Sequence, residues 1–278
     1  MIRILTDSST GFSLEDVKKI GVEMAHLTIN FDGIEYFDQK NITHDEFYIK
    51  FKTSKSLPKT SAVNQTAFEE FFEDVKKKGD EMIVLTIAKE LSATHGEAVK
   101  AKAQVGYDKI HIIDTRAVAT TLIALVMEAV RMRGEEKTAA EIIAELNKMV
   151  PKVKLHAYVD TLKYLRAGGR ISGTSMVIGT LLKIKPALTL EDGKIISKHK
   201  TLGTKKAQEY LLSRLKENNV DFSKPVYFAH TNAKEECEKV KEWAKREHNL
   251  IDGGTWFISA TVATHAGPGA VAIVFFVK

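Results

Sequence analysis

Short apolar runs alternate with stretches of helical periodicity through the first half of the chain, and this alternation constrains the fold most. The apolar runs 2–5, 82–87 and 110–113 each precede a segment whose apolar residues recur at helical spacing. Strands that alternate with helices favour a parallel sheet with helices on both faces. We therefore expect an α/β fold that begins with a three-layer α/β/α arrangement around a parallel sheet.

Pro151 marks a change in this pattern, because proline cannot continue the helical segment 138–149 before it. Beyond it, the runs 183–190 and 194–200 flank Asp192-Gly193, which is a hairpin signal. Hairpins mixed with helices predict a mixed, partly antiparallel sheet. The sequence thus predicts two domains: an N-terminal α/β domain over residues 1–151 and a C-terminal α/β domain with a mixed sheet over residues 152–278.

The composition excludes several classes of protein. No apolar run reaches the length of a transmembrane helix, and the N-terminus predicts a strand instead of a signal peptide. We therefore expect a cytoplasmic protein without stable membrane insertion. Cys237 is the only cysteine, which rules out an intramolecular disulfide and a cysteine-rich metal site. The nine histidines show no ligand spacing, so we expect no metal.

The net charge of +5 is concentrated in residues 151–206, which hold twelve Lys and Arg residues against three Asp and Glu residues. Such a segment can attract phosphates, nucleic acid or an acidic protein partner. Aromatic residues for base stacking are not interleaved with these charges, so we expect no nucleic acid. An acidic protein partner stays open, and a solvated surface is the plainer alternative.

Three stretches rich in hydroxyl groups follow expected strands or precede expected helices. They are Thr6-Asp7-Ser8-Ser9, Lys59-Thr60-Ser61-Ala62 and Leu91-Ser92-Ala93-Thr94. The edge of a parallel sheet where its strands end is a common place for ligands, and hydroxyls are good partners for carboxylate or phosphate oxygens. The alternative for each stretch is ordinary capping of the next helix.

Two glycine-rich stretches complete the set of candidate site residues. His265-Ala266-Gly267-Pro268-Gly269-Ala270 places a titratable ring beside a turn before the last apolar strand, and its glycines allow close approach of the backbone. Gly168-Gly169-Arg170 presents a guanidinium that suits an anion, or is a surface loop. We therefore predict a small-ligand site, with the following candidate residues: Thr60, Ser61, Ser92, Thr94, Arg170, His265 and Gly267.

Signatures of several enzyme classes are missing from the sequence. There is no Gly-x-Ser-x-Gly elbow, no Walker A loop and no His-Glu-x-x-His zinc helix. Residues 267–272 match Gly-x-Gly-x-x-Ala, but an apolar strand follows them where a dinucleotide fingerprint needs a helix. We predict no catalytic residues and no cofactor. The alternative is a phosphotransferase or hydrolase that uses Asp7, Ser92 and His265 on a small anion.

Taken in order, these stretches resemble the DegV family of bacterial fatty-acid-binding proteins. The resemblance spans nearly the whole chain and rests on Thr6-Asp7-Ser8-Ser9, Lys59-Thr60-Ser61, Leu91-Ser92-x-Thr94, Asp114-Thr115, Leu162-x-Tyr164-Leu165-x-x-Gly168-Gly169-Arg170-Ile171-Ser172, Ile184-Lys185-Pro186, Lys205-Lys206-Ala207 and His265-x-Gly267-Pro268-Gly269-Ala270. It implies two α/β domains with a long-chain fatty acid between them. It also implies that Thr60 and Ser92 bind the carboxylate with His265 nearby.

The resemblance further implies a partner. Some members are the acyl-binding subunits of a bacterial fatty acid kinase and present the acid to an ATP-binding protein for phospholipid synthesis. This chain departs from the family pattern at Ala62, Ala93 and Leu202, and the last stands where kinase-associated members carry an arginine linked to partner function.

The tail of the acid would lie against apolar side chains of both domains, for which Phe12, Phe68 and Met176 are candidates. A further alternative is a partner-docking module with a structural lipid. In that case the basic face around Lys183, Lys198 and Lys200 would bind an acidic protein.

Overall fold

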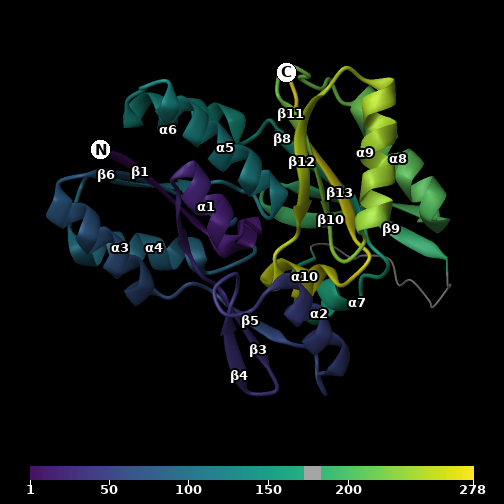
Figure 1. Ribbon diagram of the computed structural model, residues 1–278, viewed down its shortest axis with the longest axis horizontal. Helices are drawn as coiled ribbons and strands as arrows, with labels where there is room; N and C mark the ends of the chain where they lie inside the picture. The colour runs from purple at the N-terminus through teal and green to yellow at the C-terminus, as the bar shows by residue number, and fades with distance from the viewer. Residues whose placement is uncertain (172–182) are drawn as a thin grey trace.

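The computed structural model describes residues 1–171 and 183–278, so Ser172 and Met176 lie outside the described residues. Within the described ranges, no helix combines the length and the apolar character that crossing a membrane requires. The described chain forms two large sheets and one small sheet, with helices around and between them (Figure 1).

The first sheet is entirely parallel, with strand order β2-β1-β6-β7, as the alternation of strands and helices predicts. Its strands are β1 (Ile2–Asp7), β2 (Glu23–Ala25), β6 (Glu81–Thr86) and β7 (Ile110–Asp114). Successive side chains of a strand point to opposite faces. Leu5 and Val84 therefore pack on α3 (Gln65–Lys78) and α4 (Thr94–Val105). Ile4 and Ile83 belong to the core on the other face, with α1 (Leu14–Ile20), α5 (Thr120–Gly134) and α6 (Ala139–Met149).

The second sheet is mixed, with strand order β10-β9-β8-β13-β11-β12, as the hairpin signals predict. Its strands are β8 (Val153–Tyr158), β9 (Ile184–Glu191), β10 (Lys194–Leu202), β11 (Pro225–His230), β12 (Ile251–Phe257) and β13 (Val271–Phe276). Only β11 and β12 pair in parallel among these described strands. Helices α8 (Gly203–Glu217) and α9 (Lys234–Glu247) cover its outer face through Phe228, Val271 and Phe275.

Helix α5 lies between the two large sheets and joins them into one hydrophobic core (Figure 1). It contacts β1 and β6 of the parallel sheet and β8 and β13 of the mixed sheet. A helix that is apolar on all sides is a buried helix, and residues 120–126 of α5 are all buried. The expected domain boundary near Pro151 falls in the turn between α6 and β8, and the division into two domains stays a prediction.

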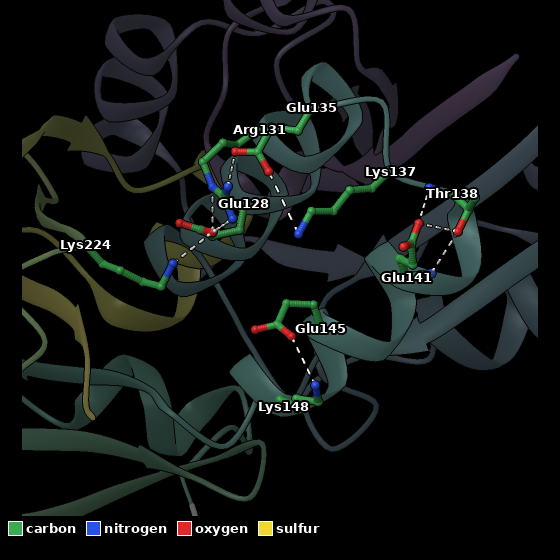
Figure 2. A network of polar contacts seen from close by, with 9 residues as sticks. All are labelled: Glu128, Arg131, Glu135, Lys137, Thr138, Glu141, Glu145, Lys148 and Lys224. Carbon is green, nitrogen blue, oxygen red and sulfur yellow. Dashed lines mark hydrogen bonds and ion pairs between the residues drawn. The ribbon is translucent and has the colours of Figure 1, made fainter.

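An ion-pair network on α5 also connects the two halves (Figure 2). The Glu128 carboxylate is only 6% exposed, and it accepts from Arg131 on the same helix and from Lys224, just before β11, at 3.1 Å. A buried carboxylate needs such partners, since an uncompensated charge in the interior is strongly destabilising. The network therefore fixes how α5 meets the mixed sheet.

Two parts of the fold differ from the expectation. The hairpin of β3 (Thr28–Phe31) and β4 (Ile34–Phe37) joins β5 (Lys59–Ser61) in a separate three-stranded sheet, against which α2 (His44–Thr53) packs. The stretch before β13, expected as a turn with a histidine, is the short helix α10 (Ala260–Ala266) followed by that turn. His265 thus lies in the last turn of a helix, which Ser259 caps by accepting from the Val262 N–H.

Candidate functional site

An apolar cavity of about 190 Å³ lies where the mixed sheet faces the end of β6 and the start of α5. Strands β8, β9 and β10 contribute Leu155, Leu188 and Ile195 to its wall. Ala157 and Ala272 also line it, and they are direct cross-strand partners in β8 and β13. Two small side chains at paired positions leave the sheet face hollow at this point, because each stops at Cβ.

Polar side chains from four distant segments meet in this same cavity. Thr60 and Ser61 come from β5, Ser92 from the loop after β6, Arg170 from the segment after α7 (Lys163–Ala167), and His265 from α10. These are five of the predicted site residues. The helix after β5 is capped by Asn64, so capping by Thr60 or Ser61, the alternative for this stretch, is wrong.

Thr60 and His265 form a hydrogen-bonded pair, with 2.9 Å between Oγ1 and Nε2. Burial, aided by the charge of Arg170, lowers the pKa of His265 to about 4, so the ring is neutral near pH 7. Its Nδ1 is buried and has no partner among the described residues. We assign the ring proton to Nε2, which then donates to Thr60. The hydroxyl proton of Thr60 is free to be donated to an acceptor in the cavity.

Arg170 adds positive charge beside this pair. Its Nε donates to the Leu91 carbonyl at 3.2 Å, and its terminal nitrogen donates to the Gly168 carbonyl. Leu91 directly precedes Ser92, so the guanidinium also holds the loop that carries that hydroxyl. A fixed cation beside two hydroxyls suits an anionic group.

Thr94, a predicted site residue, does not lie at the surface of the cavity. It is fully buried. Its Oγ1 lies 2.9 Å from the Ser92 Oγ and accepts from the Val63 N–H at 3.3 Å. Helix α4 has Ala93 at its N-cap and no side-chain cap. The Thr94 hydroxyl therefore orients Ser92 instead of reaching into the cavity.

The glycines of the site allow close packing of α7 on α10. Gly267, a predicted site residue, does not line the cavity; it has φ +72°, and a Cβ there would overlap the Tyr164 ring. At Gly168 a Cβ would lie 2.7 Å from Cε1 of His265 and closer still to Nδ1. Gly168 is thus a site residue that sequence reasoning missed, and the paired glycines before Arg170 were its signal.

The structure corrects the expectation for the Thr6-Asp7-Ser8-Ser9 stretch. Asp7 is fully buried, and its carboxylate accepts from the Ile87 N–H at 2.7 Å and from Ser9. Ser8 and Ser9 are fully buried in the short 3-10 helix η1 (Ser8–Thr10). These groups bind the protein's own backbone, so they offer no anion site at the sheet edge, and Asp7 is not placed to act with Ser92 and His265.

Two of the residues suggested for the tail contacts, Phe12 and Phe68, lie in the core and not in this cavity. Phe12 packs edge-on against Trp256 with 5.3 Å between ring centroids, and Phe68 packs against Phe72 under the parallel sheet. Neither lines the cavity. Both aromatic rings thus fill the core, and the apolar residues that line the cavity are aliphatic.

Residues 1–278 match a protein family described as the uncharacterised DegV family. The chain belongs to the DegV family. A DegV domain-containing protein of Caldanaerobacter subterraneus subsp. tengcongensis is 33% identical over 279 residues, which cover 99% of this chain and 98% of that protein.

Solved structures of DegV proteins share this fold, and several of those proteins are described as binding fatty acids. A fatty-acid-binding DegV family protein from Thermus thermophilus is 25% identical, with TM-score 0.90 over 100% of this chain and 99% of that one. DegV from Bacillus subtilis, described as a fatty acid binding protein, is 27% identical, with TM-score 0.86 over 100% and 99% of the two chains. Fatty acid binding is therefore found among DegV proteins of this fold.

A second, outer hollow of about 370 Å³ reaches the same polar groups in this DegV chain. It shares Thr60, Arg170 and His265 with the apolar cavity and adds Lys59 and Tyr164. The polar groups thus stand between the two spaces. A group held by them can be reached from either space.

His265 should make the stability of this DegV chain depend on pH. Its pKa is near 4 when folded against an ordinary 6.5, so unfolding takes up a proton between these values. Its contribution to stability is complete above pH 6.5 and is lost as the pH falls toward 4, by about 3 kcal/mol at most. Urea unfolding at about pH 7 and about pH 4.5 should show a smaller acid loss for His265→Gln than for the wild type. Equal losses would contradict this assignment, since the other titrating groups are common to both proteins.

Proposed function

We propose that this chain binds a long-chain fatty acid, with the carboxylate among Thr60, Ser92 and His265 and the tail in the apolar cavity. One observation carries the proposal. A single cavity joins an aliphatic wall to hydroxyl side chains that include Thr60 and Ser92, to a neutral imidazole and to an arginine. Such a division into an apolar part and a compact polar part matches an amphipathic acid.

The tail dominates the affinity, and the head group sets the position of the ligand. Burying each methylene contributes about 0.8 kcal/mol before association and ordering costs, so a tail with many buried methylenes contributes more than the head group does. A buried carboxylate without donors would take up a proton or fail to bind. The hydroxyls of Thr60 and Ser92 supply those donors, and Arg170 supplies the compensating charge.

Removing either hydroxyl should weaken binding with little effect on the fold. A hydrogen bond to a charged group contributes about 1.5–3 kcal/mol, so Thr60→Ala and Ser92→Ala should each lower palmitate affinity by roughly ten- to a hundredfold. Isothermal titration with palmitate measures this effect. Ser213→Ala, on the outer helix α8, is the control and should bind as the wild type does. Unchanged affinity in both site variants would show that the head group lies elsewhere.

We further propose that the protein has no reaction of its own and presents the bound acid to an ATP-dependent fatty acid kinase partner. The outer hollow favours this role, because it reaches Thr60 and His265 from outside the cavity. Leu202 is 63% exposed at the end of β10, so the position of the family's arginine is at the surface but uncharged.

The acid-loaded protein, mixed with ATP and the ATP-binding subunit of a bacterial fatty acid kinase, tests this presenting role. The expected result is one ADP and one acyl phosphate per acid consumed. No ADP would instead favour the alternative in which Lys183, Lys198 and Lys200 dock an acidic protein around a structural lipid.

A further inference from the structure

Helix α10 carries His265 but spans only seven residues, Ala260–Ala266. A helix of this length is not stable on its own, because nucleation costs more than so few hydrogen bonds return. The position of the His265 ring therefore depends on what holds the two ends of α10. At each end a buried polar residue from a distant segment does so.

Thr231 holds the C-terminal end. It directly follows β11 and is fully buried. Its Oγ1 donates to the Gly267 carbonyl at 2.6 Å and accepts from the Ala270 N–H at 2.8 Å. Its backbone N–H donates to the Ala270 carbonyl at 3.0 Å, and its carbonyl accepts from the Gly269 N–H at 2.7 Å. One residue thus fastens the whole turn that ends α10 to the mixed sheet.

Asp38 holds the N-terminal end from the loop between β4 and α2. It is fully buried, and its Oδ2 accepts from the Thr261 N–H at 2.8 Å. Its Oδ1 accepts from the Gln39 side chain at 3.2 Å, and its backbone N–H donates to the Leu27 carbonyl at 2.9 Å. The carboxylate therefore links the small three-stranded sheet, which also carries Thr60 on β5, to the helix that carries His265.

We infer that Thr231 and Asp38 are positioning residues that fix the His265 ring against Thr60. Neither side chain lines the cavity, so both act through α10. The expected loss of palmitate affinity rests on the proposed fatty-acid binding, whereas the expected change in the position of the His265 ring does not. The contacts that these two residues make with α10 and with the turn after it join segments that are far apart in the chain. Neither residue belongs to the motifs that indicated the site.

The test compares ring geometry and affinity in matched variants. Thr231→Val keeps the volume and removes both side-chain hydrogen bonds, Thr231→Ser keeps the hydroxyl, and Asp38→Asn keeps the size and removes the charge. Nitrogen-15 NMR of the ligand-free protein reports the tautomer and the pKa of His265, and titration with palmitate reports affinity. For Thr231→Val and Asp38→Asn we expect the pKa of His265 to rise from about 4 toward its ordinary 6.5. We also expect affinity to fall about tenfold or more.

Thr115→Val is the matched control for a general loss of stability. The Thr115 hydroxyl is also buried, donates to the Thr86 carbonyl at 2.6 Å and accepts from the Ala117 N–H at 3.1 Å. Thr115→Val should leave the His265 resonances where they are in the wild type. Thr231→Ser, which keeps the hydroxyl, should do the same. Unchanged His265 resonances in folded Thr231→Val and Asp38→Asn overturn the inference. If Thr231→Val does not fold, Asp38→Asn decides alone.

The outcome separates this inference from the proposed function. A wild-type protein that takes up no palmitate, together with His265 resonances that move in Thr231→Val, would refute fatty-acid binding and support the positioning role. Normal palmitate binding together with unmoved resonances and unchanged affinity in these variants would refute the positioning role alone.

Discussion

Gly168→Ala is expected to lower fatty-acid affinity about a hundredfold, because it drives the His265 ring away from Thr60. The new Cβ would lie 2.7 Å from Cε1 of His265 and closer to Nδ1. Gly168 has φ −83° and ψ −9°, which alanine adopts freely, so the effect is steric and not a matter of backbone strain. Overpacking of this kind also costs about 1–3 kcal/mol of stability. Titration with palmitate and urea unfolding measure the two effects.

A double-mutant cycle isolates the steric cause. In a His265→Ala background the ring is gone, so Gly168→Ala should then cost little stability. The interaction energy between the two substitutions should therefore equal most of the loss in unfolding free energy that Gly168→Ala causes alone. Gly96→Ala is the control, since a Cβ at Gly96 in α4 meets nothing within 4 Å; it should be neutral or slightly stabilising. A Gly168→Ala variant that binds palmitate as the wild type does would show that the His265 ring is not needed where the structure places it.

Ala157→Leu is expected to abolish fatty-acid binding while leaving the ligand-free protein as stable or more stable. Ala157 lies on β8 in the cavity wall beside its cross-strand partners Ala272 and Leu188. A leucine there occupies the space of the tail. The methylene groups that it buries contribute about 0.8 kcal/mol each, so the free energy of unfolding should rise by about 1–2 kcal/mol after strain. Palmitate titration should therefore show a loss of affinity, while urea unfolding should show a higher free energy of unfolding.

Ala229→Leu is the matched control for this second prediction. Ala229 is a buried alanine on β11, is the cross-strand partner of Ala272 in β13, and does not line the cavity. Leucine at this position meets packed atoms and should cost about 1–3 kcal/mol. If Ala157→Leu destabilises the protein as much as Ala229→Leu does, the space beside Ala157 is not a ligand cavity.

The order of strands and helices could be predicted because each buried strand and each long helix has a characteristic pattern of apolar residues in consecutive positions. The run 82–87 is buried on both faces, as expected for a strand covered by helices on two sides. The pairing of β5 with the β3–β4 hairpin in a separate sheet and the helix α10 escaped prediction. Strand β5 and helix α10 are each too short to show a period, and tertiary contacts stabilise each one.

The candidate site could be predicted in part. Thr60, Ser61, Ser92, Arg170 and His265 meet in one cavity. Thr94 and Asp7 carry the same types of polar group, yet both are buried against backbone N–H groups. A hydroxyl or carboxylate serves a ligand and a backbone N–H equally well, so residue type alone cannot distinguish the two uses. The contact of Gly168 with His265 is likewise set by how α7 packs on α10. The paired glycines before Arg170 indicate that the backbone can approach another group closely there, but not which group.

Native mass spectrometry of the freshly purified protein, followed by organic extraction and identification of the lipid, tests the central claim most directly. We expect an adduct with the mass of a long-chain fatty acid on the wild type and its loss from Ala157→Leu. A protein without an adduct that also takes up no fatty acid on addition would contradict fatty-acid binding. It would favour the alternative in which the cavity binds a small anion.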